Sequence, residues 1–224
     1  MFKSLVEFFV FYSESDATYY PTTAGNIALV VLIFLLFIGM AVFSGYRRKT
    51  QAKQMAFSAA AMALALITAR FTVMELPQGG SITLFSMFFI CLIGYLYGPK
   101  VGILAGLAYG ILDLTMDPYV VHPIQLLLDY PIAYGCLGLA GIFSKSKYGM
   151  VKGYILAVLG RYICHVITGI IFFGMYAGGQ NVVIYSLSYN ATYIVPEAIA
   201  TIVILSIPGM QMALMEVKKM ALEA

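Results

Sequence analysis

Long apolar runs alternate with short polar connections along most of the chain. Most of these runs approach the ~20 residues that a helix needs to cross a bilayer. Seven runs extend approximately over Asn26 to Gly45, Met55 to Met74, Ile82 to Tyr97, Val101 to Leu114, Ile124 to Phe143, Tyr154 to Tyr176 and Tyr189 to Met212. The third and fourth runs are short, so we expect tilted or irregular helices there. The pattern predicts an all-α integral membrane protein.

The composition supports this fold class. The 224 residues are 62% hydrophobic and 10% charged, whereas soluble domains are about 45–50% apolar and about 25% charged. The first run is followed by Arg47-Arg48-Lys49 without a small-residue cleavage pattern, so we predict a retained helix. We therefore expect an N-terminal segment (1–25), an extra transmembrane helix (26–46), a membrane domain (55–215) and a tail (216–224).

The basic residues predict the orientation, because cytoplasmic loops of membrane proteins carry an excess of Lys and Arg. With seven spans, ten basic residues fall on one side: Arg47, Arg48, Lys49, Lys53, Lys100, Lys145, Lys147, Lys152, Lys218 and Lys219. The sequence therefore predicts a multi-pass protein of the cell membrane with its N-terminus outside and its C-terminus in the cytoplasm.

Several classes of function are disfavoured. No G-x-x-x-x-G-K-[ST], H-E-x-x-H or G-x-S-x-G motif is present. The polar connections are too short to hold an ATPase or a kinase, and a net charge of +3 does not favour a nucleic-acid partner. The three cysteines lie within predicted spans, where buried thiols are expected rather than a metal site. We predict neither a metal nor another cofactor.

Asp129 is the most informative residue, because it lies in an apolar stretch from Pro123 to Tyr134. A carboxylate at the centre of a membrane helix costs about 2.5–3.5 kcal/mol on insertion scales, so it should face a polar cavity or a partner charge. His122 and Gln125 share its helix face at spacings of three and four. Asp129 is either a ligand-binding group or a structural bond between helices, and His122 either contacts a ligand or caps the helix.

The sixth run carries two further rare residues on one face, Arg161 and His165. His165 is either a ligand contact or a hydrogen-bond partner between helices. Arg161 lies one turn nearer the cytoplasm, so we predict a structural role, as a partner of Asp113, Glu197 or Asp129.

The outer connections add aromatic and amide groups. Tyr119 precedes the fifth run, and Tyr185 and Asn190 lead into the seventh. Tyr185 is either a ligand contact or an anchor at the membrane boundary. The loop over residues 75–81 contains Pro77 and a Gly-Gly pair, which predict a tight turn or a cover over a ligand.

These groups predict one cavity that opens outward and binds a small, cationic, aromatic-containing solute. The absence of nucleophile–base spacing favours binding over catalysis, so we predict no catalytic residue. Two alternatives are a membrane sensor or assembly protein, and a small membrane enzyme with Asp129 and His165 as an acid–base pair.

The second run is rich in alanine. Small residues spaced four apart let another helix approach closely. Ala56, Ala59, Ala60 and Ala63 therefore serve either internal packing or the docking of a partner subunit in the membrane.

Several motifs occur in order over about Met55 to Met215. They are Pro77-Gln78-Gly79-Gly80-Ser81-Ile82-Thr83; Tyr97-Gly98-Pro99-Lys100 with Gly102 and Gly106; Asp117-Pro118-Tyr119 with His122-Pro123-Ile124-Gln125 and Leu128-Asp129-Tyr130; Arg161-Tyr162 with His165, Gly169 and Phe172-Phe173-Gly174; and Val183-Ile184-Tyr185-Ser186-Leu187 with Asn190. This set resembles the thiamine-specific S component of energy-coupling factor transporters. In that family's pattern, glutamate stands at Asp129 and tryptophans stand near Gly79 and at Phe173.

The resemblance implies a six-helix S-component bundle, here with one extra N-terminal transmembrane helix. It implies that the chain captures thiamine from outside, in the lipid bilayer, together with a coupling subunit and two cytoplasmic ATPase subunits. An S component for a related vitamin or thiamine precursor is the alternative within the family. The binding positions that carry over are Tyr119, Asp129, Tyr130, His165, Tyr185 and Asn190, and Phe173 is added as a stacking ring.

The roles implied for these residues follow the chemistry of thiamine. Asp129 would balance the thiazolium charge or hold the aminopyrimidine, with His165, Tyr185 and Asn190 as hydrogen-bonding groups. Tyr119 and Phe173 would stack on the ligand, and Tyr130 would bind its hydroxyethyl group. The alanine-rich run would dock on the coupling subunit.

Overall fold

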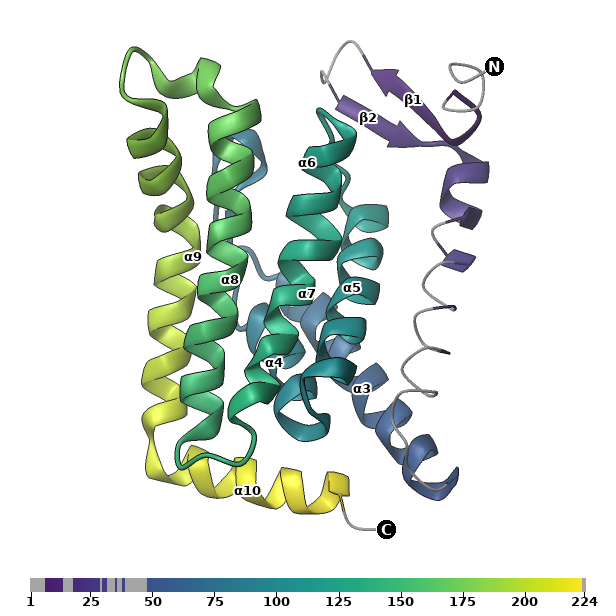
Figure 1. Cartoon of the computed structure of the whole chain (residues 1–224), viewed down its shortest axis with the longest axis vertical. Coiled ribbons are helices and arrows are strands. Elements are labelled where there is room, and N and C mark those ends of the chain that lie inside the picture. Colours follow the sequence, from purple (N-terminus) through teal and green to yellow (C-terminus); the bar gives the residue numbers. More distant parts are fainter. Residues whose placement is uncertain are drawn as a thin grey trace.

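The computed structural model describes residues 7–13, 18–28, 30–31, 35, 38 and 48–222. The predicted extra helix over 26–46 therefore lies largely outside the described residues. The described N-terminal part contains an antiparallel hairpin of β1 (Val10–Ser13) and β2 (Thr18–Pro21). This hairpin and the C-terminal helix α10 lie at opposite ends of the molecule (Figure 1).

Six helical segments form a bundle within residues 48–222, as predicted (Figure 1). They are α3 (Arg48–Ala69), α4 (Ser86–Tyr97), α5 (Pro99–Met116), an irregular helix over Pro123–Phe143, α8 (Gly149–Phe172) and α9 (Val182–Ser206). Five are long and apolar enough to cross a membrane, and α4 is a shorter apolar helix. Helix α5 is longer than the predicted run from Val101 to Leu114. It already begins at Pro99, because the first position of a helix needs no backbone N–H donor.

The predicted seventh span is wrong at both ends. Helix α9 already begins at Val182, because the Asn181 side chain accepts the N–H groups of Val183 and Ile184. It stops at Ser206, and α10 (Pro208–Leu222) follows across the base of the bundle (Figure 1). Pro208 explains the break, since it cannot donate to the helix before it.

Helix α10 includes most of the predicted tail, since it extends to Leu222. Its buried side chains are Leu214 and Ala221. Lys218 donates a hydrogen bond to the carbonyl of Ser144, and its ammonium lies 4.2 Å from the centre of the Tyr95 ring. Burial, followed by the charge of Lys145, lowers the pKa of Lys218. These contacts hold α10 against the bundle.

The fifth span is an irregular helix. It consists of α6 (Pro123–Leu127), the π-helical η2 (Leu128–Ile132), α7 (Ala133–Leu137) and the 3-10 segment η3 (Gly138–Phe143). Pro131 lies inside η2 and cannot donate a backbone hydrogen bond, which favours a wider turn at this point. Asp129 lies on this wide turn, so the irregularity falls at the residue of greatest interest.

Small residues let α5 pack closely on this irregular helix. A Cβ atom added at Gly110 would lie 2.8 Å from the Cα of Pro131, and one added at Gly102 would lie 2.9 Å from the Cα of Gly138. Only glycine leaves room for such contact. The close approach brings Asp113 of α5 next to Tyr134, whose hydroxyl donates to the Asp113 carboxylate at 2.9 Å.

A short hairpin closes the connection between α3 and α4. Strands β3 (Met74–Glu75) and β4 (Ser81–Ile82) flank the turn η1 (Pro77–Gly79). The Tyr189 hydroxyl of α9 donates to the carbonyl of Pro77 and accepts the N–H of Gly80 at 3.2 Å. The tight turn predicted from the Gly-Gly pair is therefore present, and α9 holds it in place.

Candidate functional site

A cavity of about 440 Å³ lies within the bundle. Most of its lining residues come from the β3–β4 turn, α5, the loop before α6, η2, α8 and α9. All seven predicted binding residues line it: Tyr119, Asp129, Tyr130, His165, Phe173, Tyr185 and Asn190. The fold thus brings together residues that are up to 71 positions apart in the chain, the difference between 190 and 119.

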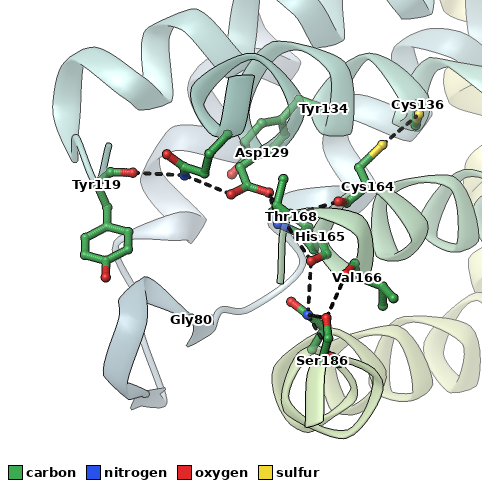
Figure 2. A network of polar contacts seen from close by, with 12 residues as sticks. Gly80, Tyr119, Asp129, Tyr134, Cys136, Cys164, His165, Val166, Thr168 and Ser186 are labelled. Carbon is green, nitrogen blue, oxygen red and sulfur yellow. Dashed lines mark hydrogen bonds and ion pairs between the residues drawn. The ribbon is translucent and has the colours of Figure 1, made fainter. Parts of the chain in front are cut away.

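Asp129 connects the two sides of this cavity (Figure 2). Its Oδ2 accepts a hydrogen bond from the Gln125 amide at 2.8 Å. Its Oδ1 accepts from the Thr168 hydroxyl at 2.6 Å and lies 3.0 Å from Nδ1 of His165. The carboxylate therefore joins η2 to α8, which matches the structural alternative, and it also faces the cavity, which a binding role requires.

Gln125 determines how Asp129 is held. Its side chain is only 1% exposed. The amide nitrogen donates both to Asp129 and to the carbonyl of Tyr119 at 3.1 Å, and the amide oxygen accepts the N–H of Val121 at 3.1 Å. One buried amide thereby fixes the carboxylate and the loop that carries Tyr119.

His165 presents an unused nitrogen to the cavity. Because Nδ1 is directed at Asp129, the proton of a neutral imidazole lies on that atom and Nε2 becomes an acceptor. Nε2 is buried and has no hydrogen-bond partner among the described residues. Buried polar atoms normally have one. The free atom suits an N–H group of a bound ligand.

Both polar atoms of the Asn190 side chain form hydrogen bonds within the protein. Its amide nitrogen donates to the carbonyls of Ser186 at 2.9 Å and His165 at 3.2 Å, and its oxygen accepts from the Tyr193 hydroxyl at 2.6 Å. The bond to His165 fastens α9 to the turn of α8 that carries the histidine, and the other two lie within α9. Asn190 lines the cavity, and it also positions the histidine.

Aromatic rings also line the cavity. The rings of Tyr119 and Phe173 stack at 6.1 Å with an angle of 18°, and those of Tyr185 and Tyr189 stack at 5.9 Å with an angle of 26°. Burial raises the pKa of Tyr119, so its hydroxyl remains protonated at neutral pH. The arrangement offers several ring faces to a flat or cationic ligand.

Gly79 makes room for one of these rings. Its φ of +82° is a conformation that other residues rarely adopt, and a Cβ atom there would lie 3.1 Å from Cδ1 of Tyr119. The space beside the missing side chain is therefore occupied by Tyr119, which comes from the loop before α6. Tyr119 therefore supplies an aromatic wall beside Gly79.

Tyr130 is tied to the same loop. Its hydroxyl accepts the N–H of Tyr119 at 2.8 Å and donates to the carbonyl of Asp117 at 3.0 Å. Both bonds go to the backbone, so the hydroxyl orders the loop before α6.

The inner part of the cavity contains Arg161, for which the predicted pairing is wrong. Among the described residues, Arg161 forms no ion pair with Asp113, Asp129 or Glu197 within 4.0 Å. Its guanidinium carbon lies 3.9 Å from the centre of the Tyr134 ring. Nε and Nη1 are buried without a hydrogen-bond partner in the part of the chain that the structure describes. A cation–π contact holds the side chain instead, and N–H groups remain available beside the cavity.

Sequence reasoning treated Glu197 only as a partner for Arg161, whereas Glu197 lines the cavity itself. It is 6% exposed, accepts from the Thr83 hydroxyl at 2.7 Å and lies 3.3 Å from the N–H of Met87. The sequence could have indicated Glu197 in the same way as Asp129, because both are carboxylates within an apolar helix. Tyr193 and Tyr20 also line the cavity and carried no comparable signal.

His122 is not among the residues that line the cavity, and it has the predicted role of a helix cap. Its Nδ1 accepts the N–H of Ile124 at 3.1 Å and so caps α6. Its ring stacks on Phe172 at 4.9 Å.

The alanines of α3 are divided between two faces. Ala61 and Ala65 are buried in the bundle core. Ala56, Ala59, Ala60 and Ala63 are exposed on the surface of the chain. The second set does not serve packing within the described chain, which leaves the partner-docking alternative open.

Comparison with known proteins identifies the family. The model of the thiamine transporter protein family (Thia_YuaJ) matches residues 54–216. The chain belongs to this family. The match covers the six-helix bundle apart from the start of α3, and every cavity-lining residue except Tyr20.

Individual members of the family agree with this assignment. The chain is 39% identical over 163 residues to the thiamine transporter ThiT of Bacillus subtilis, covering 66% of this chain and 83% of that protein. It is 35% identical over 121 residues to ThiT of Lacticaseibacillus paracasei, covering 46% of this chain and 60% of that protein.

A solved structure of ThiT from Listeria monocytogenes has the same fold. It superposes with a TM-score of 0.55 at 24% identity, over 69% of this chain and 91% of that chain. The protein is therefore an all-α, multi-pass membrane protein of a transporter family.

Proposed function

We propose that this chain binds thiamine with high affinity on the extracellular side of the membrane and is the S component of an energy-coupling factor importer. The observation that carries the proposal is Asp129, a carboxylate that faces the cavity and is held by Gln125, Thr168 and His165. Thiamine is a cation with two flat rings. A fixed negative charge beside stacked aromatic rings complements both properties.

The polar atoms of the cavity fit the aminopyrimidine group. Asp129 accepts hydrogen bonds, and the free Nε2 of His165 accepts one more. The unpartnered N–H groups of Arg161 donate. An aminopyrimidine offers amino hydrogens and ring nitrogens, so donors and acceptors are available for both. Binding needs no bond-making step, so we propose that the chain is not an enzyme.

The orientation follows from the basic residues. Lys145, Lys147 and Lys152 lie at or beside the connection between η3 and α8, at the end of the bundle that α10 crosses (Figure 1). The positive-inside rule puts this end in the cytoplasm. The loop before α6 then faces outward, and the cavity receives its ligand from outside.

Transport driven by ATP requires partners, because this chain has no nucleotide-binding motif. We propose that a membrane coupling subunit and two cytoplasmic ATPases supply the energy. The exposed alanines Ala56, Ala59, Ala60 and Ala63 provide a surface of small side chains on α3 where a coupling helix can approach closely.

Isothermal titration of the purified chain tests the ligand. We expect thiamine to bind far more tightly than the hydroxymethylpyrimidine precursor, which lacks the cationic ring. Binding of thiamine no tighter than millimolar would refute the proposal. Tighter binding of the precursor would reassign the chain to that ligand, and the absence of binding by either compound would favour a sensor or assembly role.

A further inference from the structure

The N-terminal hairpin is held in a defined shape. Phe11 of β1 pairs with Tyr20 of β2, and their rings stack at 5.7 Å with an angle of 26°. The Thr22 hydroxyl donates to the carbonyl of Phe8 at 2.6 Å, and the Thr22 N–H donates to the carbonyl of Phe9 at 2.9 Å. The direction of Tyr20 is therefore set by strand pairing and by a neighbouring ring.

Tyr20 is part of the wall of the cavity that contains Asp129. It is half-buried. The other described residues of that wall lie between Ala69 and Glu197, inside the segment that matches the family model, whereas Tyr20 lies before it. The hairpin lies at the end of the molecule opposite α10 (Figure 1). Its contribution to the cavity is therefore at the outer mouth.

Tyr20 shares this cavity with another aromatic residue and with polar residues. Tyr119, Gln78 and Asp117 line the same cavity. Tyr119 is already stacked on Phe173, so one side of the opening is aromatic. A ring supplied by a separate element gives the mouth a second aromatic group, and a flat cation that leaves the cavity must pass it.

We propose that Tyr20 is a substrate-contacting residue at the mouth of the cavity, and that it slows the release of a cationic aromatic ligand. This inference rests on the proposed binding of thiamine for its ligand. It adds a specificity element from a hairpin outside the region shared with the family. The stacked Phe11 ring holds Tyr20 in the orientation that the contact requires.

The kinetic test uses the full-length chain and radiolabelled thiamine. We expect Tyr20→Ala to release thiamine about two- to fivefold faster than the parent chain, as the loss of one cation–π contact predicts. Tyr20→Phe keeps the ring, so it should retain most of the slow release. The control is Phe8→Ala, which removes an exposed aromatic side chain that does not line the cavity. Release by Tyr20→Ala at the parental rate would overturn the proposal.

A second measurement needs no thiamine. Tyr20→Cys and Phe8→Cys are labelled with a water-soluble maleimide in the purified chain, and the parent chain gives the background from its own cysteines. We expect slower labelling at position 20, because its side chain lies in the cavity wall, than at position 8, which is 62% exposed. Equal rates would overturn the placement of Tyr20. If the parent chain bound no thiamine, the proposed function would fail, while the labelling would still decide this placement.

Discussion

Nδ1 of His165 lies 3.0 Å from Oδ1 of Asp129, which links the turn of α8 to the π-helical turn of the preceding span. Thr168, one turn along α8, donates to the same carboxylate oxygen. A carboxylate inside a membrane protein is stable only when such partners compensate its lost hydration. The cavity therefore contains a prepared negative site, and several measurements follow from its construction.

Neutralising Asp129 should weaken ligand binding. We expect Asp129→Asn to lower the affinity for thiamine by about ten- to a hundredfold, because a hydrogen bond to a charged group contributes about 1.5–3 kcal/mol. Isothermal titration measures the change. Glu216→Gln is the control, since it removes one negative charge from an exposed site on α10 outside the cavity. Equal affinities of Asp129→Asn and the control would contradict the role of Asp129.

Removing the buried amide of Gln125 should destabilise the fold. In Gln125→Leu, the N–H of Val121 and the carbonyl of Tyr119 lose their partner. Each buried group left unsatisfied costs about 1–3 kcal/mol. We expect a lower midpoint of thermal unfolding, together with weaker thiamine binding because Asp129 loses a donor. Gln180→Leu, at an exposed position, should change neither quantity. An unchanged midpoint in Gln125→Leu would show that these bonds contribute little.

A side chain at position 79 should disturb Tyr119. Gly79 and Gly179 have φ angles of +82° and +87°, so alanine is strained at both. A Cβ atom at 79 meets the Tyr119 ring, whereas nothing lies within 4 Å at 179. We therefore expect both variants to lose similar stability and only Gly79→Ala to lose thiamine affinity. Thermal unfolding and isothermal titration separate the two effects, and parallel losses of affinity would refute the role of the Tyr119 wall.

Enlarging the exposed alanine face of α3 should block assembly and leave ligand binding intact. We expect Ala60→Leu to bind thiamine like the parent chain, because Ala60 is exposed and lies outside the cavity. The larger side chain should keep a coupling helix from close approach. Co-purification with a coupling subunit and uptake of labelled thiamine by cells measure assembly. Ala200→Leu makes the same change on an exposed position of α9. Normal assembly of Ala60→Leu would place the docking surface elsewhere.

Much of the membrane topology follows from local properties of the sequence. Apolar runs near the length of a bilayer predict the spans, and the costly Asp129 and His165 mark the cavity, because desolvation penalises a polar side chain wherever the helix packs. The helix ends were less predictable. Pro208 divides the last run into α9 and α10, and a hydropathy pattern does not register a proline at an apolar boundary.

The partners of the polar residues depend on packing in three dimensions. Sequence spacing predicted a carboxylate partner for Arg161, yet its guanidinium lies over the Tyr134 ring of the fifth span. Helix α8 packs closely on that span, since a Cβ atom added at Gly160 would lie 3.0 Å from Cβ of Cys136. Helical periodicity says which residues share a face, and it does not say which face of which helix lies opposite.

The amino-acid pattern alone thus predicted an all-α membrane fold and a polar cavity, and it singled out Asp129 as the first candidate in that cavity. Packing decided that the Asp129 carboxylate contacts Gln125, Thr168 and His165. It also placed the Tyr119 ring beside Gly79. It also brought Tyr20 into the wall of the cavity. The reason is that hydropathy and desolvation act on each residue locally, whereas hydrogen bonds and ring contacts depend on the distances between segments far apart in the chain.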